Sequence, residues 1–362
     1  MRTIRITGTG SALPGRIVTN KELEQMVETS DEWIRERTGI GERHVSVGET
    51  VVALASEAAR KALEQAGKRA EEIDLILVAT CSPEQYLPCC ACQVQADIGA
   101  VNALAFDVNA ACSGFLFALN TADAYLRMGL AENALIIGSE VLSKLVDWTD
   151  RGSCILFGDG AGAVVVERRK AESRAVECGN DLAETEKGMQ ETAEEKRIPA
   201  AGILGRALHS DGTGGGVLQC DARELTTPYA RTSAVKTDQN QPMDDREHFI
   251  QMDGQEVYRF ATRRVPQCIE EALSDAGLAV PDIDLFVLHQ ANARIIDAVA
   301  KRLHADRDKF PTNLERVGNM SSASIPVLLD ELNRQRKLHR GDRIVLAGFG
   351  AGLTIGACVM TW

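Results

Sequence analysis

Residues 62–67 read Ala-Leu-Glu-Gln-Ala-Gly, and residues 272–277 read Ala-Leu-Ser-Asp-Ala-Gly, an offset of 210. In each copy an amphipathic helix pattern ends at a glycine, which suits the left-handed position after a helix. An Ile-Asp-Leu sequence then opens an apolar stretch, at 73–75 and again at 283–285. The repeat predicts two related α/β halves, each a sheet of buried strands covered by helices.

Polar sequence separates these predicted halves. Residues 168–197 are dense in Glu and Lys, and residues 221–248 are polar without clear periodicity. We therefore expect an N-terminal half at 1–168, an insertion and connecting segment at 169–250, and a C-terminal half at 251–362.

The composition excludes several classes of protein. The 362 residues include 40 basic and 52 acidic ones, and the net charge of -12 has the wrong sign for general nucleic-acid binding. No apolar run reaches the roughly 18 residues of a membrane span, and the N-terminus lacks the apolar region of a secretory signal. We expect a cytoplasmic protein with no nucleic-acid or membrane partner. Its ten cysteines should be reduced thiols, and Cys89-Cys90-x-Cys92 lacks the second ligand pair of a metal site.

Cys112 stands at the junction of a predicted strand and a predicted helix. The apolar residues 103–108 are followed by Asn109-Ala110-Ala111-Cys112-Ser113-Gly114 and then by a helix pattern. A cysteine beside the unpaired amides of a helix N-terminus has a lowered pKa, and so supplies more nucleophilic thiolate. Cys112 is therefore either a catalytic nucleophile or a buried structural cysteine.

His289 directly follows the apolar stretch 285–288. The carboxyl ends of strands are where open α/β sheets place ligands and catalytic groups. A histidine there can act as an acid, a base or a hydrogen-bond donor. The alternative is a structural histidine held by backbone contacts.

Asn319 lies in a run of small residues, Gly318-Asn319-Met320-Ser321-Ser322. The offset of 210 places Asn319 opposite Asn109, and it places Ser322 opposite Cys112. The duplicated turn therefore carries a candidate nucleophile in one half and a polar amide in the other.

The glycine-rich stretches do not support a dinucleotide site. Residues 158–163 match the loose dinucleotide pattern, but an apolar β run follows them instead of a helix. Residues 348–352 follow a predicted strand and can present backbone amides to an oxyanion. No pattern typical of a P-loop, a kinase, a zinc protease or a serine hydrolase is present.

Together these motifs resemble those of the 3-ketoacyl-(acyl-carrier-protein) synthase III family. The Cys112, His289 and Asn319 motifs stand in the family's order, and the similarity covers about 1–168 and 202–362. The family has the thiolase fold, so the resemblance implies two pseudo-symmetric α/β halves that form a layered αβαβα core. Further matching motifs lie at 8–11, 30–34, 37–40, 149–152 and 157–162.

The resemblance implies a decarboxylating Claisen condensation that initiates fatty acid synthesis. Cys112 would take the acyl group from an acyl-CoA, with the oxyanion held by the N–H groups of Cys112 and Ala351. His289 and Asn319 would then hydrogen-bond the thioester carbonyl of malonyl-acyl-carrier protein, stabilising the enolate formed as carbon dioxide leaves. No metal and no cofactor besides the two thioester substrates is implied.

The resemblance also assigns residues to CoA. Trp33 and Arg151 would hold the adenine on either side. Arg37 would lie near the phosphates, and Asn292 would orient a water near the pantetheine.

Two further sets of residues follow from the same resemblance. Leu87 would be contributed by the second subunit of a homodimer to an acyl pocket that Phe349 also lines. A basic patch would dock the acidic carrier protein, or would be only a solvated helix face. Its members are Arg259, Arg294, Lys301 and Arg302.

Related enzymes differ at identifiable positions. A thiolase would carry a second catalytic cysteine in the C-terminal glycine-rich loop, and residues 350–356 contain none. An elongating ketosynthase would carry a histidine where Asn319 stands. A non-catalytic subunit would lack a residue of the triad, and all three are present. The alternative left open is a paralogous condensing enzyme or acyltransferase that uses unusual starters in polyketide or secondary metabolism.

Overall fold

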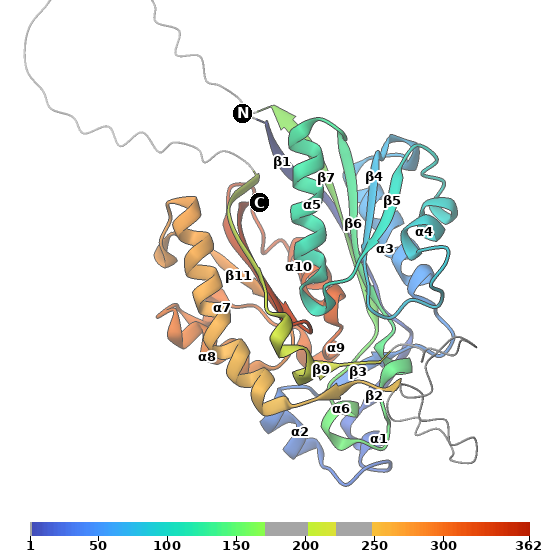
Figure 1. The fold of residues 1–362 in the computed structure, drawn as a ribbon, viewed down its shortest axis with the longest axis vertical. Helices are drawn as coiled ribbons and strands as arrows, with labels where there is room; N and C mark the ends of the chain where they lie inside the picture. The colour runs from blue at the N-terminus through green and yellow to red at the C-terminus, as the bar shows by residue number, and fades with distance from the viewer. Residues whose placement is uncertain (1, 171–201, 222–247) are drawn as a thin grey trace, which may run out of the picture.

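The computed structural model describes residues 2–170, 202–221 and 248–362, in which two sheets lie face to face (Figure 1). The first sheet has the order β1 (Arg2–Ala12), β7 (Gly160–Lys170), β6 (Asn133–Glu140), β4 (Leu75–Ala79) and β5 (Leu104–Val108). The second has the order β11 (Leu285–Leu288), β12 (Arg343–Gly350), β13 (Thr354–Thr361) and β8 (Gly202–Ser210). The β6–β4, β4–β5 and β11–β12 pairs are parallel, and the other pairs within these sheets are antiparallel.

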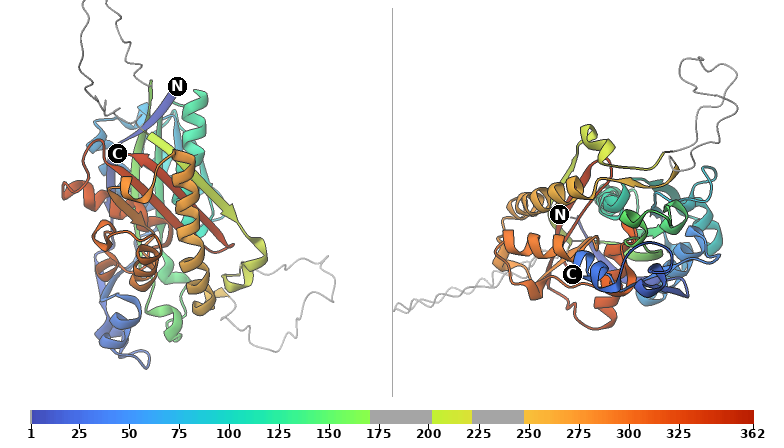
Figure 2. Two further views of the ribbon diagram at one scale, coloured as in Figure 1. Left: turned by 90° about the vertical axis from the view of Figure 1, so that its left-hand side faces the viewer. Right: turned by 90° about the horizontal axis from the view of Figure 1, so that it is seen from below.

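Helices cover both faces of each sheet (Figures 1 and 2). Between the sheets lie α5 (Gly114–Met128) and α10 (Ser324–Arg334), whose apolar residues form one central cluster with both sheets. The outer face of the first sheet is covered by α3 (Val51–Ala66) and α4 (Cys90–Ile98). The outer face of the second is covered by α7 (Gly254–Ala276) and α8 (Ala293–Arg302). The architecture is the expected αβαβα sandwich.

The smaller elements gather mostly at the lower end of Figure 1. The short helices are α1 (Asn20–Leu23), α2 (Asp31–Thr38), α6 (Arg151–Cys154) and α9 (Leu314–Val317), and the short strands are β2 (Arg16–Thr19), β3 (Glu42–Val45), β9 (Leu218–Gln219) and β10 (Gln251–Met252). The 3-10 turns are η1 (Ala70–Glu72), η2 (Ala111–Ser113), η3 (Leu142–Leu145), η4 (Gly212–Val217), η6 (Val280–Asp282), η7 (Arg307–Lys309) and η8 (Ser321–Ala323).

β4 shows why its sequence is apolar throughout. Leu75, Leu77 and Ala79 face the central layer with α5 and α10, whereas Ile76 and Val78 face α3 and α4. A strand buried on both faces loses the alternation of apolar and polar residues. The prediction that this run is an interior strand is confirmed.

The repeat has a direct physical counterpart in the two halves. A Cβ at Gly8 of β1 would lie 2.2 Å from Ala62 O of α3, and one at Gly205 of β8 would lie 2.3 Å from Ala272 O of α7. In each half, glycine lets the helix cross directly over the strand. Both helices end as expected at a left-handed glycine, with φ of 65° at Gly67 and at Gly277.

The boundary of the second half differs from the expected residue 251. β8 falls within the segment 169–250, yet it pairs with β13 as an edge strand of the second sheet. The rest of that segment lies largely outside the described residues, at 171–201 and 222–247. No helix in the described ranges is both long and apolar enough to cross a membrane.

Candidate active site

Cys112 lies in η2, between the end of β5 and the start of α5, as the sequence predicts. Its side chain is 9% exposed and lines a cavity of about 1150 Å³. The preceding residue, Ala111, has a left-handed φ of 46°, so the chain reverses sharply just before the thiol. This geometry directs the cysteine into the cavity at the edge of the first sheet.

The expected lowering of the Cys112 pKa does not appear. Burial raises the pKa of this thiol to about 12, and the nearby Ser321 hydroxyl lowers it by less. Helix α5 begins only at Gly114, and removal from water outweighs its terminus. In the substrate-free protein Cys112 is therefore a neutral thiol.

Gly350 leaves the backbone of Cys112 open. A Cβ at Gly350 would lie 2.6 Å from Cys112 N and 3.1 Å from Ala111 Cβ. The next residue, Ala351, lines the same cavity as Cys112. The amide groups of Cys112 and Ala351, which the family resemblance implies for an oxyanion hole, therefore lie on two neighbouring turns.

His289 immediately follows β11 and is 3% exposed. Its Nδ1 is buried and has no hydrogen-bond partner among the described residues. Burial lowers the pKa of the imidazole to about 3, so the ring is neutral near pH 7. A neutral imidazole keeps one N–H donor and one acceptor nitrogen.

β12 brings His289 and Cys112 to one place. A Cβ at Gly348 would lie 3.4 Å from His289 Cβ, and one at Gly350 would meet the Cys112 backbone. Positions 348 and 350 face the same side of the strand because side chains alternate. The backbone of Cys112 and the Cβ of His289 therefore lie against one face near the end of β12.

Asn319 precedes η8 and is 7% exposed. Its Oδ1 accepts a hydrogen bond from Ser321 N at 2.9 Å, and its backbone N donates to Leu156 O at 2.9 Å. The Nδ2 group has no partner within the described part of the chain. The side chain is thereby fixed with its donor end free.

The expected CoA residues lie together beside this cavity. Arg151 Cζ is 4.8 Å from the centroid of the Trp33 ring, and Arg37 Cζ is 5.7 Å from it. Trp33 belongs to the same apolar cluster as Leu142 and Phe157, which line the cavity. Asn292 caps α8 through Arg294 N and donates from Nδ2 to Arg37 O at 3.1 Å.

The two residues expected at an acyl pocket lie in different places. Leu87 lines the cavity and is 87% exposed. Phe349 is not among the lining residues in the described ranges. It points to the α7 side of β12, opposite the face of Gly348 and Gly350, and its ring meets His289 edge-on with centroids 5.6 Å apart. The alternation of side chains along β12 causes this difference.

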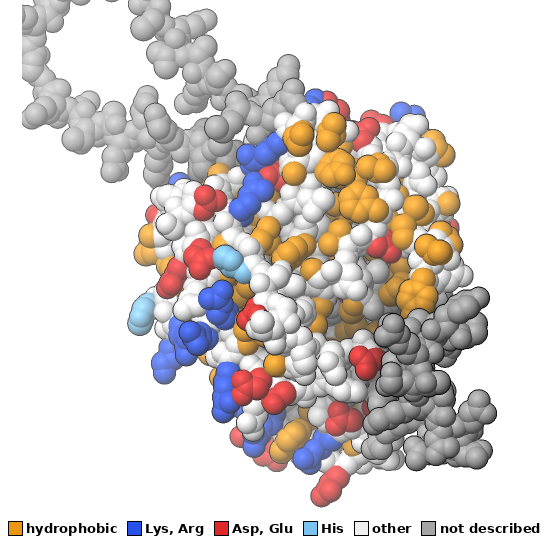
Figure 3. All heavy atoms as spheres, in the orientation of Figure 1, with side chains coloured by type: hydrophobic (Ala, Val, Ile, Leu, Met, Phe, Trp, Pro, Cys, Tyr) orange, Lys and Arg blue, Asp and Glu red, His pale blue; other side chains and the backbone are white. Residues whose placement is uncertain are grey.

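The four basic residues expected to dock a carrier protein are exposed on α7 and α8. Figure 3 shows basic side chains over this part of the surface with acidic ones among them. Arg259 forms an ion pair with Glu256, and Arg294 lies over the Tyr258 ring with Cζ 5.9 Å from the centroid.

Two buried ionisable residues near the site were not anticipated. Glu140 ends β6 and is 0% exposed, and Arg43 of β3 is 0% exposed beneath the Gly318 turn. The signal for Glu140 was present, because it is an acidic residue at the end of an apolar strand. Arg43 offered no such signal, since an arginine in a polar stretch is usually exposed.

The layered fold, with a buried cysteine at a strand-to-helix turn, is that of a condensing enzyme of the thiolase fold. Family models of 3-oxoacyl-[acyl-carrier-protein (ACP)] synthase III match residues 106–181, and those of its C-terminal part match 273–362. The chain belongs to the 3-oxoacyl-[acyl-carrier-protein] synthase III family, whose members are acyl-transferring condensing enzymes.

Individual relatives match along the whole chain. The beta-ketoacyl-[acyl-carrier-protein] synthase III of Clostridium acetobutylicum is 43% identical over 362 residues, covering 100% of this chain and 99% of the relative. The 3-oxoacyl-[acyl-carrier-protein] synthase III structure from Aquifex aeolicus is 37% identical with a TM-score of 0.83, covering 99% and 100%. The priming beta-ketosynthase of the R1128 polyketide pathway is 32% identical with a TM-score of 0.83, covering 99% and 96%.

Proposed function

We propose that this protein condenses an acyl-CoA with malonyl-acyl-carrier protein, with loss of carbon dioxide, to start fatty acid synthesis in the cytoplasm. The observation that carries the proposal is the duplicated turn. One copy presents Cys112 and the other presents the free Nδ2 of Asn319, with His289 beside β12. The reaction needs no cofactor besides its two thioester substrates.

In the first half-reaction the Cys112 sulfur attacks the acyl-CoA carbonyl. The N–H groups of Cys112 and Ala351 bind the oxyanion. The bond from the carbonyl to the CoA sulfur breaks, and the CoA thiolate takes up the proton given by Cys112. Because the resting thiol is neutral, its proton leaves as attack occurs and passes to the departing CoA sulfur.

In the second half-reaction malonyl-carrier protein replaces CoA. Its thioester carbonyl accepts hydrogen bonds from neutral His289 and from Asn319 Nδ2. The bond between the malonyl α-carbon and its carboxylate breaks, and carbon dioxide leaves. The electron pair of that bond forms an enolate whose negative charge lies on the thioester oxygen. The enolate carbon attacks the acyl group on Cys112, and the sulfur leaves as thiolate. Uncharged donors suit this step, since a carboxylate would repel the enolate.

The substrates would reach the cavity along surfaces already described. The Trp33, Arg37 and Arg151 cluster offers an aromatic face and two cations to the adenine and phosphates of CoA, with Asn292 beside it. The Arg259, Arg294, Lys301 and Arg302 patch offers positive charge to an acidic carrier protein.

We also propose a homodimer formed through the β5 edge of the first sheet. β5 has no strand partner on its outer side among the described residues. Exposed apolar side chains surround it and reach the cavity mouth, and Figure 3 shows apolar atoms gathered over α4, α5 and β5. They include Leu87, Val101, Leu104, Met128 and Leu130. An unpaired edge with apolar surroundings favours pairing with a second copy.

Two measurements test this proposal. Intact-protein mass spectrometry after incubation with acyl-CoAs from acetyl to dodecanoyl should show one acyl adduct, absent in Cys112→Ala. Malonyl-carrier protein should then remove it with release of carbon dioxide. Absence of an adduct with every donor would refute the proposal.

The same panel tests a second candidate function. The similarity to a priming polyketide ketosynthase favours a starter enzyme of secondary metabolism as the alternative. Labelling confined to long, branched or aromatic acyl groups would select it, whereas labelling by short straight chains would select fatty acid initiation. The proposed dimer has its own test: Leu104→Asp should yield monomers by light scattering, while Val47→Asp, at an exposed apolar residue just after β3, should not.

A further inference from the structure

Glu140 is a buried carboxyl group that the proposed reaction does not use. Its Oε2 lies 2.6 Å from Ser82 Oγ, 3.2 Å from Thr80 Oγ1 and 3.1 Å from Cys81 N. Its Oε1 lies 2.8 Å from Ser322 Oγ in η8. Glu140 therefore joins the first half of the protein to the turn that follows Asn319.

The position of the Ser322 hydroxyl proton shows which group donates the hydrogen bond between Ser322 and Glu140. Ser322 Oγ lies 2.8 Å from Ala79 O and 2.8 Å from Glu140 Oε1. The backbone carbonyl can only accept, so the single hydroxyl proton of Ser322 goes to Ala79. The contact with Oε1 then requires a proton from the carboxyl group itself.

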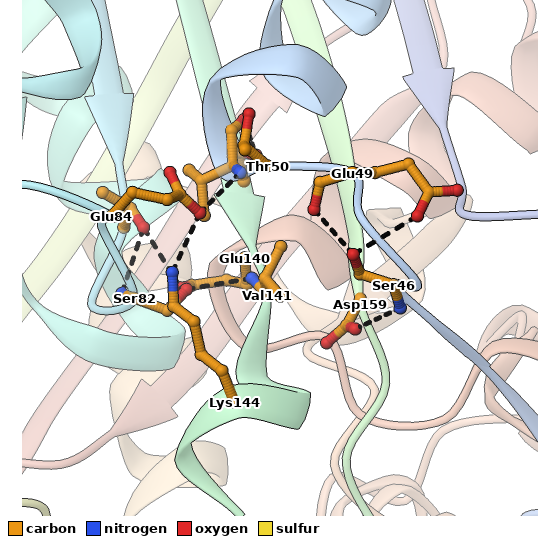
Figure 4. Close-up of polar contacts among 12 residues, drawn as sticks. Ser46, Glu49, Thr50, Ser82, Glu84, Glu140, Val141, Lys144 and Asp159 are labelled. Atoms are coloured by element: carbon orange, nitrogen blue, oxygen red, sulfur yellow. Dashed lines mark hydrogen bonds and ion pairs between the residues drawn. The ribbon is translucent and has the colours of Figure 1, made fainter.

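The hydroxyl donors face the other oxygen, Oε2. Cys81 is shared between the two oxygens, with its N 3.1 Å from Oε2 and 3.3 Å from Oε1 and its Sγ 3.5 Å from each. Ser82 Oγ accepts from Val141 N at 2.9 Å (Figure 4), so its own proton is available to Glu140 Oε2. Thr80 Oγ1 accepts from Ser82 N at 3.2 Å and likewise donates to Oε2. Oε2 is thus the carbonyl oxygen and Oε1 the hydroxyl oxygen. Burial raises the pKa of Glu140, which favours the same neutral form.

We propose that Glu140 is a neutral carboxylic acid that positions Asn319 by donating a hydrogen bond to Ser322. The η8 turn held in this way includes Ser321, whose N–H holds Asn319 Oδ1 at 2.9 Å. A neutral acid also places no charge beside Cys112, whose thiolate a carboxylate would oppose. The inference rests on the proposed function, because it assumes that Asn319 acts in the decarboxylating step.

Asp159 provides a matched control. It is also 0% exposed, and Figure 4 shows its contact with Ser46 beside the Glu140 group. Its Oδ1 accepts from Ser143 N at 2.9 Å, and its Oδ2 accepts from Ser46 N at 2.7 Å. Both oxygens face N–H donors, so an amide there would turn its NH2 group against one of them. Asp159→Asn should therefore destabilise the protein, whereas Glu140→Gln should not.

The test compares Glu140→Gln, Glu140→Ala, Asn319→Ala and Asp159→Asn. We measure thermal unfolding, acylation of Cys112 and the kcat of condensation. Glu140→Gln should keep a kcat within about threefold of the parent, because its amide donates to Ser322. Glu140→Ala should acylate with an unchanged KM for acyl-CoA but lose about 10²-fold in condensation kcat, because Asn319 shifts. The infrared spectrum of the parent should contain a protonated carboxyl band that Glu140→Gln lacks.

Three results would overturn the inference. The first is a Glu140→Gln enzyme as impaired as Glu140→Ala. The second is the absence of the protonated carboxyl band from the spectrum of the parent protein. That measurement requires only the parent and a folded Glu140→Gln variant. The third is a Glu140→Ala enzyme with unchanged condensation. Full condensation by Asn319→Ala would instead refute the role of Asn319 in the proposed function, and would remove the basis of the inference with it.

Discussion

Ala111 and Ser321 hold the same left-handed backbone, with φ of 46° and 47°, at positions 210 residues apart. Such a φ costs a residue with a side chain about 1–2 kcal/mol, so the surroundings must hold each turn. An asparagine supports both turns, since Asn109 Oδ1 accepts from Ala111 N at 3.3 Å and Asn319 Oδ1 from Ser321 N at 2.9 Å. Duplication has thus preserved the turn while the side chains diverged.

The positions that face these turns explain why only one is open. Gly350 faces the Cys112 turn and leaves its amide uncovered. The equivalent position, 210 residues earlier, is Glu140, whose carboxyl group instead fills the space at Ser322. The two halves therefore share a framework. The space beside the Cys112 turn can receive an oxyanion, whereas the equivalent space at Ser322 is occupied by the Glu140 side chain.

Gly350→Ala should abolish most of the acyl transfer to Cys112. The new Cβ would lie 2.6 Å from Cys112 N, so the amide must move or be covered. Loss of one oxyanion donor costs about 10²–10³-fold in rate. Acyl-transfer reactions are quenched at set times, and intact-protein mass spectrometry gives the acylated fraction from which this rate is calculated. Gly348→Ala, on the same face of β12 with its nearest atom at 3.4 Å, is the control and should retain at least about a tenth of the activity.

Much of this framework could be predicted from the sequence because the repeat has a physical cause. The helix ends at Gly67 and Gly277 and the strand β4 were all correctly predicted. Glycine favours the left-handed position after a helix, and an unbroken apolar run is typical of a strand buried on both faces. The prediction of a lowered pKa for Cys112 was wrong, because the burial that raises it depends on how η8 and β12 pack over the turn. The direction of the Phe349 side chain could not be predicted, because the face of a strand depends on register, which a wholly apolar strand does not reveal.

The rate of Cys112 alkylation by iodoacetamide should rise steadily with pH. Because the pKa of the buried thiol is about 12, the thiolate fraction increases about tenfold for each pH unit between 7 and 10. Site-resolved mass spectrometry separates Cys112 from the other cysteines, and free cysteine, which reaches a plateau above its lower pKa, is the reference. A plateau for Cys112 below pH 8 would mean that the helix terminus outweighs burial after all.

Trp33→Ala and Arg151→Ala should weaken the use of acyl-CoA but not of a truncated thioester. Arg151 lies 4.8 Å from the Trp33 ring, and either change removes one side of the expected adenine site. We expect KM for acyl-CoA to rise about tenfold, in line with about 1–2 kcal/mol for a desolvated contact of this kind. Acyl-pantetheine lacks the nucleotide, so its kinetics should be unchanged. An equal effect on both substrates would place the nucleotide elsewhere.

Asn319→Asp should separate the two half-reactions. The change keeps the oxygen that accepts from Ser321 N but replaces the free Nδ2 donor with a second oxygen, in a site that is 7% exposed. An ionised carboxylate would repel the enolate, and a neutral one would lose the pre-set donor, so decarboxylation of malonyl-carrier protein should fall by about 10²-fold or more. Acylation of Cys112 should change far less, because the oxyanion donors are backbone groups. Asn109→Asp, which alters the matching asparagine beside Cys112, is the control: any effect should fall on acylation and condensation together. If Asn319→Asp slowed both half-reactions equally, Asn319 would be a structural residue of its turn and not the donor that the second step requires.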